Sequence, residues 1–249
     1  MNKLKPLLAA AVIALFFAGT VSAQVSTQKF EIGLALSGFV YQGDLTPNRL
    51  GSFETARLGI NLHGSRIMRG SFLLRTNLAI GGIRADERIY DEPDYRKQRA
   101  LNARTPVIEL TQLVVWNPLG SNYEDRGFSP YLYAGAGIGI LNVRRDHSEF
   151  NTEFFGDASE LEALIAEDMA HDPPNVVPVI PLGGGIRYNF STRIAVHAES
   201  AYRLVFTDYL DGFSQAANPE LDDHYQTYSI GAIYRIGKKN RLDCPVVRY

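Results

Sequence analysis

The segment "TRIAVHAESAYRLVF", Thr192 to Phe206, alternates between two kinds of side chain along its whole length. Its even positions are mostly apolar, with Ile194, Val196 and Leu204 among them, whereas its odd positions include several charged residues. Successive side chains of a β-strand point to opposite faces, so a period of two predicts a strand with one apolar and one polar face. The chemistry of these two faces decides which kind of β-protein the chain forms.

Alternation of this kind recurs along the chain and predicts eight strands. The predicted ranges are 30–41, 54–67, 71–84, 104–117, 130–144, 176–190, 192–206 and 224–236. Three connections are candidates for periplasmic turns, and four are longer and polar; the longest, 145–175, also has apolar residues at helical spacing. Even strand numbers with short turns at one end and long loops at the other are typical of barrels in the bacterial cell outer membrane. We therefore predict an all-β fold, an eight-stranded antiparallel transmembrane β-barrel of up-and-down topology, with both termini periplasmic.

The polar face of the predicted strands carries arginine, glutamate and histidine, and no lysine lies in any of these strands. Lysine is a common charge on surfaces that face water, so its absence favours a crowded lumen of paired charges. An eight-stranded barrel is only wide enough for side chains to fill it. A soluble barrel, a gated pore and a proton path are less favoured alternatives. The predicted polar network of the closed lumen comprises Glu31, Arg57, His63, Arg75, Glu109, Arg187, Arg193, His197, Glu199, Arg203 and Arg235.

Two glycine-rich segments, "GAGIGI" (Gly135 to Ile140) and "GGGI" (Gly183 to Ile186), superficially resemble a phosphate-binding loop. A dinucleotide fingerprint lies between a strand and a helix, however, and no helical pattern follows either segment. Most of these glycines instead share the polar parity of neighbouring strands, where a missing side chain leaves room for long arginines. The sequence therefore predicts no nucleotide and no other cofactor.

The segment "HAES", His197 to Ser200, is the best candidate for a catalytic pair, because some barrels of this size modify lipid A. A serine nucleophile needs its base within hydrogen-bonding reach, whereas residues three apart on a strand point to opposite faces. The clusters "RRDH" (Arg144 to His147) and "LDDH" (Leu221 to His224) lie in or beside predicted loops, where such groups are more often solvated than metal-binding. We therefore expect neither an enzyme nor a metal site.

The first 23 residues have the order of a secretory signal peptide, with Lys3 and Lys5, an apolar run, and small residues up to Ala23. Residues 24–236 then form the barrel, and 237–249 form a basic periplasmic tail. The whole chain has 25 basic and 27 acidic side chains, which gives no reason to expect nucleic acid as a partner. Its single cysteine excludes a disulfide framework. Candidate residues for docking a periplasmic partner are Lys238, Lys239, Arg241 and Cys244.

The segments "FEIGLALSGFVYQGDL" (Phe30 to Leu45), "SPYLYAGAGIGI" (Ser129 to Ile140), Pro181 to Ser214 and "DCP" (Asp243 to Pro245) resemble a known family. They are similar to the OmpA-like outer-membrane barrels of Bacteroidetes-type bacteria, in particular the PorG-like proteins associated with type IX secretion. The resemblance implies a non-enzymatic structural or scaffolding protein, surrounded by outer-membrane lipid and lipopolysaccharide. For a PorG-like protein it also implies contact with periplasmic secretion-ring proteins. A general OmpA-like barrel that stabilises the envelope or is adhesive is the alternative; a narrow porin or a lipid A-modifying enzyme is less favoured.

Overall fold

The structure of the chain is a computed structural model. The described residues are 30–48, 51–69, 71–119, 126–156, 160–218 and 223–236. The predicted signal peptide, 1–23, and the predicted basic tail, 237–249, lie outside these residues. The same holds for the candidate docking residues Lys238, Lys239, Arg241 and Cys244, which therefore remain predictions.

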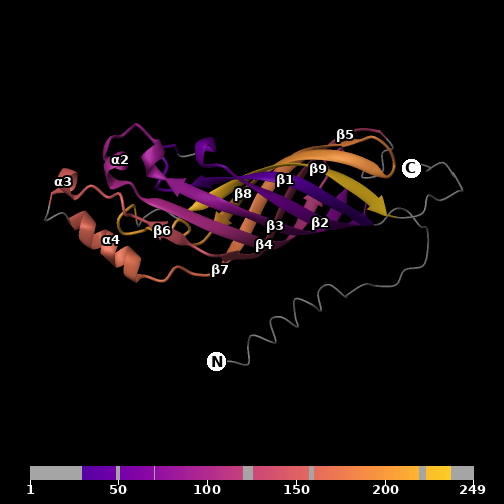
Figure 1. Cartoon of the computed structure of the whole chain (residues 1–249). Coiled ribbons are helices and arrows are strands. Elements are labelled where there is room, and N and C mark those ends of the chain that lie inside the picture. The colour runs from indigo at the N-terminus through magenta and orange to yellow at the C-terminus, as the bar shows by residue number, and fades with distance from the viewer. Residues whose placement is uncertain are drawn as a thin grey trace, which may run out of the picture. The chain divides into compact units, whose positions relative to one another are not determined.

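Eight long antiparallel strands form a closed barrel (Figure 1). They are β1 (Phe30–Gln42), β2 (Arg57–Arg69), β3 (Phe72–Asp86), β4 (Asn102–Trp116), β5 (Gly127–Leu141), β7 (Val176–Asn189), β8 (Ile194–Val205) and β9 (His224–Ile236). Each strand pairs with its neighbour along the chain, and β9 pairs with β1 along all 13 residues of β1, which closes the sheet. The predicted fold class is confirmed, and the predicted strand ends are within three residues of the observed ones.

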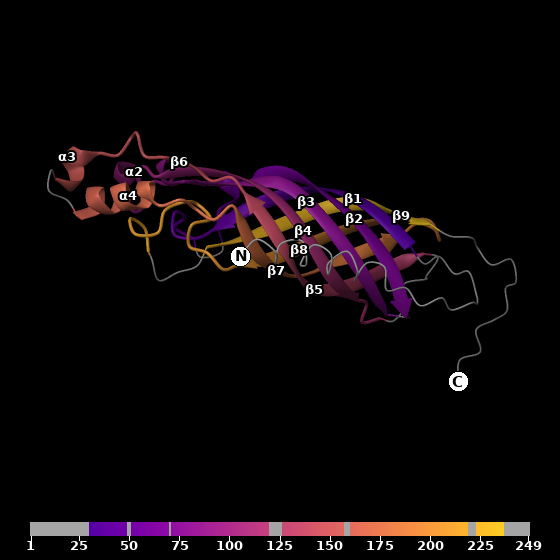
Figure 2. The same cartoon turned by 90° about the horizontal axis from the view of Figure 1, so that it is seen from below.

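Six short elements of the described residues belong to the long loops, and those labelled in Figure 2 lie beyond one end of the barrel. They are η1 (Phe53–Thr55), η2 (Glu87–Ile89), α2 (Tyr95–Arg99), β6 (Arg144–Asp146), α3 (Thr152–Phe155) and α4 (Glu160–Ala170). The strand β6 continues the sheet, because it pairs with the start of β4 beyond the point where β5 ends. The helix α4 lies in the loop for which the sequence predicts helical spacing. These elements show that the long loops are folded rather than extended.

Within the described ranges, no helix is both long enough and apolar enough to cross a membrane.

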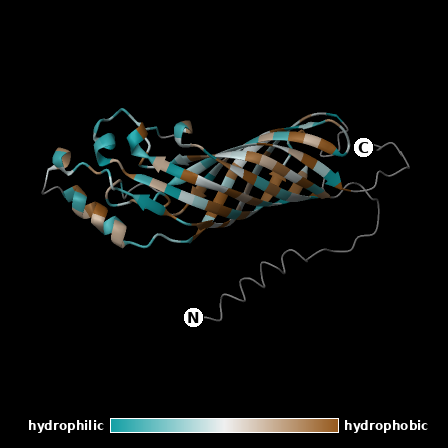
Figure 3. Cartoon of the chain, viewed as in Figure 1, coloured by the Kyte–Doolittle hydropathy of each residue, from teal (hydrophilic) through white to brown (hydrophobic). Residues whose placement is uncertain are grey.

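Many large apolar side chains of the strands are exposed on the outside of the barrel wall. The strand ribbons in Figure 3 accordingly alternate between hydrophobic and hydrophilic residues. On β1, Leu36 is 66 % exposed whereas the next residue, Ser37, is 1 % exposed, so the alternation separates the two faces of one strand. Soluble proteins rarely expose contiguous apolar patches of this extent, and closure leaves no sheet edge along the wall. The outside of the barrel therefore suits hydrocarbon, which is the environment of a transmembrane barrel.

The lumen is not polar along its whole length. Near the long loops it is filled by a buried apolar core in which strand residues such as Phe39 and Val179 pack with the loop residues Leu210 and Phe213. The prediction of a polar lumen is therefore wrong for this end. The physical reason is that the folded loops exclude water from the mouth of the barrel, so inward-facing side chains pack there as in the core of a soluble protein.

Candidate functional site

At the short-turn end of the lumen, one carboxylate binds two arginines. The carboxylate of Glu31 on β1 accepts two hydrogen bonds from Arg187 on β7, at 2.9 and 3.0 Å, and one from Arg235 on β9, at 3.0 Å. Arg235 also donates to the side-chain oxygen of Asn189, at 2.6 Å. All four side chains are buried, and the two-point contact of Arg187 is the strongest geometry for such a pair.

In the middle of the lumen, a second carboxylate lies among aromatic rings. The carboxylate of Glu199 accepts from Arg75 at 2.9 Å and from the hydroxyl of Tyr131 at 2.8 Å, and His197 Nδ1 lies 3.5 Å from it. The guanidinium of Arg75 lies over the rings of Tyr131 and Tyr133, 5.4 and 5.7 Å from their centroids. A cation over a ring face is attracted electrostatically. Arg75 is therefore bound both by the Glu199 carboxylate and by the two tyrosine rings.

A third buried carboxylate, Glu109 on β4, lies closer to the loops. It accepts from Arg203 Nε at 2.8 Å and from the hydroxyl of Tyr225 at 2.6 Å. Arg203 also donates to Thr227 and lies over the ring of Tyr225, 5.6 Å from its centroid. Each of the three lumen glutamates therefore has an arginine partner from another strand, as a buried charge requires.

Two members of the predicted network lie outside it. Arg57 is exposed at the first position of β2, at the end of the barrel where its cross-strand neighbour Phe39 fills the lumen. Arg193 is exposed in the turn before β8. The other nine are in the lumen, where the ring of His63 lies edge-on to that of His197, 5.3 Å between centroids.

Two of the lumen glycines, Gly183 and Gly185, make room for aromatic rings, which corrects the expectation that they directly accommodate arginines. Tyr131 lies directly across from Gly185, and Tyr133 lies across from Gly183. A Cβ atom added at Gly185 would lie 2.8 Å from Cζ of Tyr131, and one at Gly183 would lie 2.7 Å from Cζ of Tyr133. The tyrosines fill this space, and Arg75 then lies on the tyrosines.

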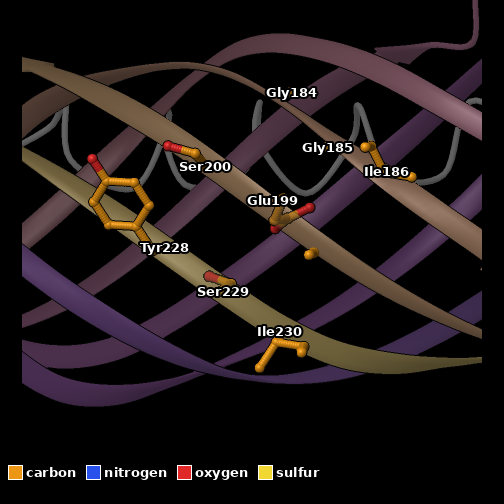
Figure 4. Close-up of a pocket in the computed structure, with 9 residues that line it drawn as sticks. Gly184, Gly185, Ile186, Glu199, Ser200, Tyr228, Ser229 and Ile230 are labelled. Carbon is orange, nitrogen blue, oxygen red and sulfur yellow. The ribbon is translucent and has the colours of Figure 1, made fainter.

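The two residues of the candidate catalytic pair, His197 and Ser200, lie on opposite sides of the barrel wall, as predicted. His197 is buried in the lumen, whereas Ser200 is exposed on the outside. There Ser200 lines an open hollow of about 490 Å³ together with Ile186, Tyr228 and Ile230 (Figure 4). None of the nine residues that line this hollow is a histidine. Glu199 also lines the hollow, but its carboxylate binds Arg75 and the Tyr131 hydroxyl in the lumen, so it is not directed at Ser200.

No group of three or more His, Cys, Asp or Glu side chains in the described part of the chain is arranged to hold a metal ion.

A buried acidic cluster lies where the last long loop meets β1. The Tyr41 hydroxyl lies 2.5 Å from Asp211 Oδ2 and 2.7 Å from Asp223 Oδ1, and the Asp211 backbone N–H donates to Asp223 Oδ2 at 3.3 Å. Burial raises the pKa of Asp211 to about 8, and burial together with the neighbouring Asp211 carboxylate raises the pKa of Asp223 well above its ordinary range. The pair therefore resists full ionisation at neutral pH.

Buried charges also connect the long loops to one another. Asp168 on α4 accepts hydrogen bonds from the backbone amides of Ser214, Gln215 and Ala216, at 2.9 to 3.2 Å. Glu87 binds Arg99 through two hydrogen bonds, at 2.6 and 2.8 Å. Arg99 in turn donates to the backbone carbonyl of Ala216. The loops therefore form one folded cap over the mouth of the barrel.

The sequence interpretation missed these cap residues because they lie in segments assigned as polar loops. The apolar residues Leu210 and Phe213, on either side of Asp211, were an available signal, because large apolar side chains are uncommon in a fully solvated loop. Both are fully buried. Apolar residues within a polar loop are thus evidence that the loop folds back onto a core.

Similar folds occur among solved structures. They include Ail, the attachment invasion locus protein of Yersinia pestis, in complex with the heparin analogue sucrose octasulfate, at 15 % identity and a TM-score of 0.45, covering 86 % of this chain and 100 % of that chain. Neisserial surface protein A has 10 % identity and a TM-score of 0.47, and the match covers 86 % of this chain and 100 % of that chain. The outer membrane enzyme PagL has 10 % identity and a TM-score of 0.35, and the match covers 81 % of this chain and 99 % of that chain. No curated protein matches the sequence. A family model described as "Domain of unknown function (DUF6089)" matches residues 9–236.

Proposed function

The chain belongs to the DUF6089 family, and we propose that it is a non-enzymatic, non-conducting barrel with a structural or scaffolding role in the outer membrane. The filled lumen is the observation that carries this proposal. Glu31, Glu109 and Glu199 bind arginines across the lumen, and an apolar core fills the end next to the loops. An eight-stranded barrel is no wider than its interior side chains require, so this interior supports anchorage and presentation rather than transport.

The proposed orientation places the short turns in the periplasm and the folded cap outside the cell, as in other barrels of this type. The start of β1 and the end of β9 are both at the short-turn end, so both chain termini would be periplasmic. The apolar outer wall would contact outer-membrane lipid and lipopolysaccharide. This orientation separates two potential binding regions, the cap on one side and the tail on the other.

We further propose that the tail binds periplasmic ring subunits of a type IX secretion apparatus. This rests on the PorG-like resemblance and on the basic residues Lys238, Lys239 and Arg241, with Cys244 nearby. Since β9 ends at Ile236, these residues follow the last strand directly. The barrel would then anchor part of the apparatus in the membrane.

Two experiments test these proposals separately. Purified protein in planar lipid bilayers should produce no conductance steps, and regular steps would contradict a sealed lumen. Crosslinking in native envelopes, followed by mass spectrometry, should recover periplasmic ring proteins with the full chain but not with a chain that ends after Gly237. Recovery of the same partners with both chains would rule out the tail as the docking site, and recovery of none would remove the secretion role.

An adhesive or envelope-stabilising role is the second candidate, and the folded cap is the observation that favours it. Asp168, Glu87 and Arg99 give the loops a fixed surface that an external ligand could recognise. Replacement of residues 145–175 by a short loop should impair adhesion and leave secretion intact in this case. Truncation after Gly237 should have the opposite effect if the tail is functional. The two variants therefore separate the two roles.

A further inference from the structure

We propose that residues 206–218 form a plug whose closure over the mouth of the barrel is strengthened by acid, because it depends on a proton held between Asp211 and Asp223. The ion pairs beneath the mouth stay in place when the plug opens. The plug therefore changes the surface that the cap presents and does not open a pore, which goes beyond the scaffolding role proposed above.

The hydrogen-bond geometry itself requires this proton. The single phenolic oxygen of Tyr41 lies within hydrogen-bonding distance of Oδ2 of Asp211 and Oδ1 of Asp223. A tyrosine hydroxyl has one hydrogen to donate, and an ionised carboxylate can only accept. If both contacts are hydrogen bonds, one of the two carboxyl groups must donate to the phenolic oxygen and is therefore protonated. All three side chains are buried, so water does not replace the missing donor.

The charges around the pair favour retention of the proton. Asp208 on the same loop and Asp44 on the loop after β1 add negative charge, and Arg99 on α2 adds one positive charge. Arg145 on β6 also approaches the plug, where it donates to the backbone carbonyl of Gly212 at 3.2 Å. With Asp211 and Asp223 themselves included, four carboxyl groups face these two cations. Burial and the surrounding carboxylates accordingly raise the pKa of Asp211 to about 8.

The protonated pair is directly connected to the residues that fill the mouth. Leu210 and Phe213 flank Asp211, are fully buried, and belong to the apolar core of the loop end. The Asp211 side chain also accepts from the backbone N–H of Phe213, at 2.9 Å. Repulsion between two ionised carboxylates would displace Asp211 and with it both apolar side chains. The proton is thus linked to closure of the mouth.

The direction of the pH effect follows from the raised pKa of Asp211. In an open plug this carboxyl would be solvated, with a pKa near 4, whereas in the closed plug its pKa is about 8. Between these values the closed form binds about one more proton than the open form, so each unit of rising pH weakens closure about tenfold. Closure is therefore strongest in acid and is progressively lost as the pH rises towards 8.

Hydrogen exchange of the plug amides tests this proposal in the full-length protein. Protection of residues 209–216 is measured by mass spectrometry between pH 5 and 9, and each variant is compared with the wild type at the same pH, which cancels the intrinsic pH dependence of exchange. Asp211→Asn preserves the acceptor for Phe213 but cannot ionise. It should give protection that is independent of pH, whereas wild-type protection should fall up to about tenfold per unit.

A glycine pair supplies the matched control. A Cβ atom at Gly43 would overlap Asp223 Oδ1 and the Tyr41 hydroxyl, whereas one at Gly38 would meet no atom within 4 Å. Gly43→Ala should therefore lower plug protection at every pH, and Gly38→Ala should behave as the wild type. Equal pH dependence in Asp211→Asn and wild type would overturn the proposal. If Asp211→Asn does not fold, Asp223→Asn provides the same test, and pH-independent wild-type protection would overturn it without any variant.

Discussion

The two halves of the lumen differ in their buried side chains: ion pairs lie beside a small apolar cluster in the half near the short turns, whereas a larger apolar core fills the half near the long loops. In the half near the short turns, strand residues such as Glu31, Arg187 and Arg235 form buried ion pairs. In the half near the long loops, Phe39 and Phe213 belong to an apolar core to which strands and loops both contribute. The same narrow barrel is thus stabilised mainly by specific ion pairs at one end and mainly by apolar packing at the other. Substitution of a buried charged residue should therefore destabilise the short-turn half most, and truncation of a buried apolar side chain should destabilise the loop half most.

The largest effect is expected when the ion pairs of the short-turn half are broken. Glu31→Leu leaves Arg187 and Arg235 buried without their carboxylate, and an uncompensated buried charge costs about 3–5 kcal/mol. The free energy of unfolding, measured by urea titration in lipid with gel mobility as readout, should fall by this amount. Arg193→Ala removes an exposed arginine and should cost less than about 0.5 kcal/mol. Equal losses in the two variants would contradict the ion-pair account.

The next effect should be confined to the loop half. Phe213→Ala removes a fully buried ring from the apolar core, which costs about 3 kcal/mol in comparable cores. We expect faster hydrogen exchange in the plug with little change in the strands, because loops can open without global unfolding. Phe154→Ala, an exposed ring of the same cap, is the control. Equal acceleration of exchange in the strands would show that the two halves unfold together.

A smaller effect should come from the fit between glycine and tyrosine. A Cβ atom at Gly185 would lie 2.5 Å from the Ala198 carbonyl oxygen and 2.8 Å from the Tyr131 ring, whereas one at Gly64 would meet nothing within 4 Å. Gly185→Ala should therefore cost about 1–3 kcal/mol of unfolding free energy through overpacking. Gly64→Ala on the outer face should cost nothing measurable in the same urea titration. A neutral Gly185→Ala would mean that Tyr131 can move aside.

The smallest predicted effect concerns Asp44 in the cap. Burial raises its pKa to about 6, above its ordinary value near 4. Its contribution to cap stability is thus fully present below pH 4 and is lost as the pH rises through 6. Asp44 is partly exposed, so the effect should remain under about 1 kcal/mol. In Asp44→Asn, the difference in plug exchange between pH 4.5 and 7 should shrink slightly relative to the wild type; an unchanged difference would exclude the role of Asp44.

The strands could be predicted from the sequence because an apolar outer face and a polar inner face alternate with a period of two along most of each strand. In β8, for example, Val196 and His197 point to opposite sides of the wall, as the alternation indicates. The errors lie where strands end. Arg57 and Arg193 have the lumen parity but occupy the first position of β2 and the turn before β8, where parity no longer determines which way a side chain points.

The partners within the lumen could not be predicted, because the pairing of residues across a barrel depends on strand register. Arg75 on β3 binds Glu199 on β8, although neither strand pairs with the other. The cap was missed for a related reason, since Asp168 and the amides that it binds belong to two separate loops. Local alternation assigns a face to each residue, but it contains no information about which distant residue shares that face.

The seam between β1 and β9 also constrains how the molecule can be made. These strands are the first and the last of the barrel, so their hydrogen bonds form only after the entire intervening chain has been synthesised. Contacts so distant in sequence make folding slow, and an open sheet edge is not tolerated in hydrocarbon. Insertion one strand at a time would leave such an edge at every stage. The barrel must therefore close as it enters the bilayer, and a chain that ends before β9 should have no stable form in the membrane.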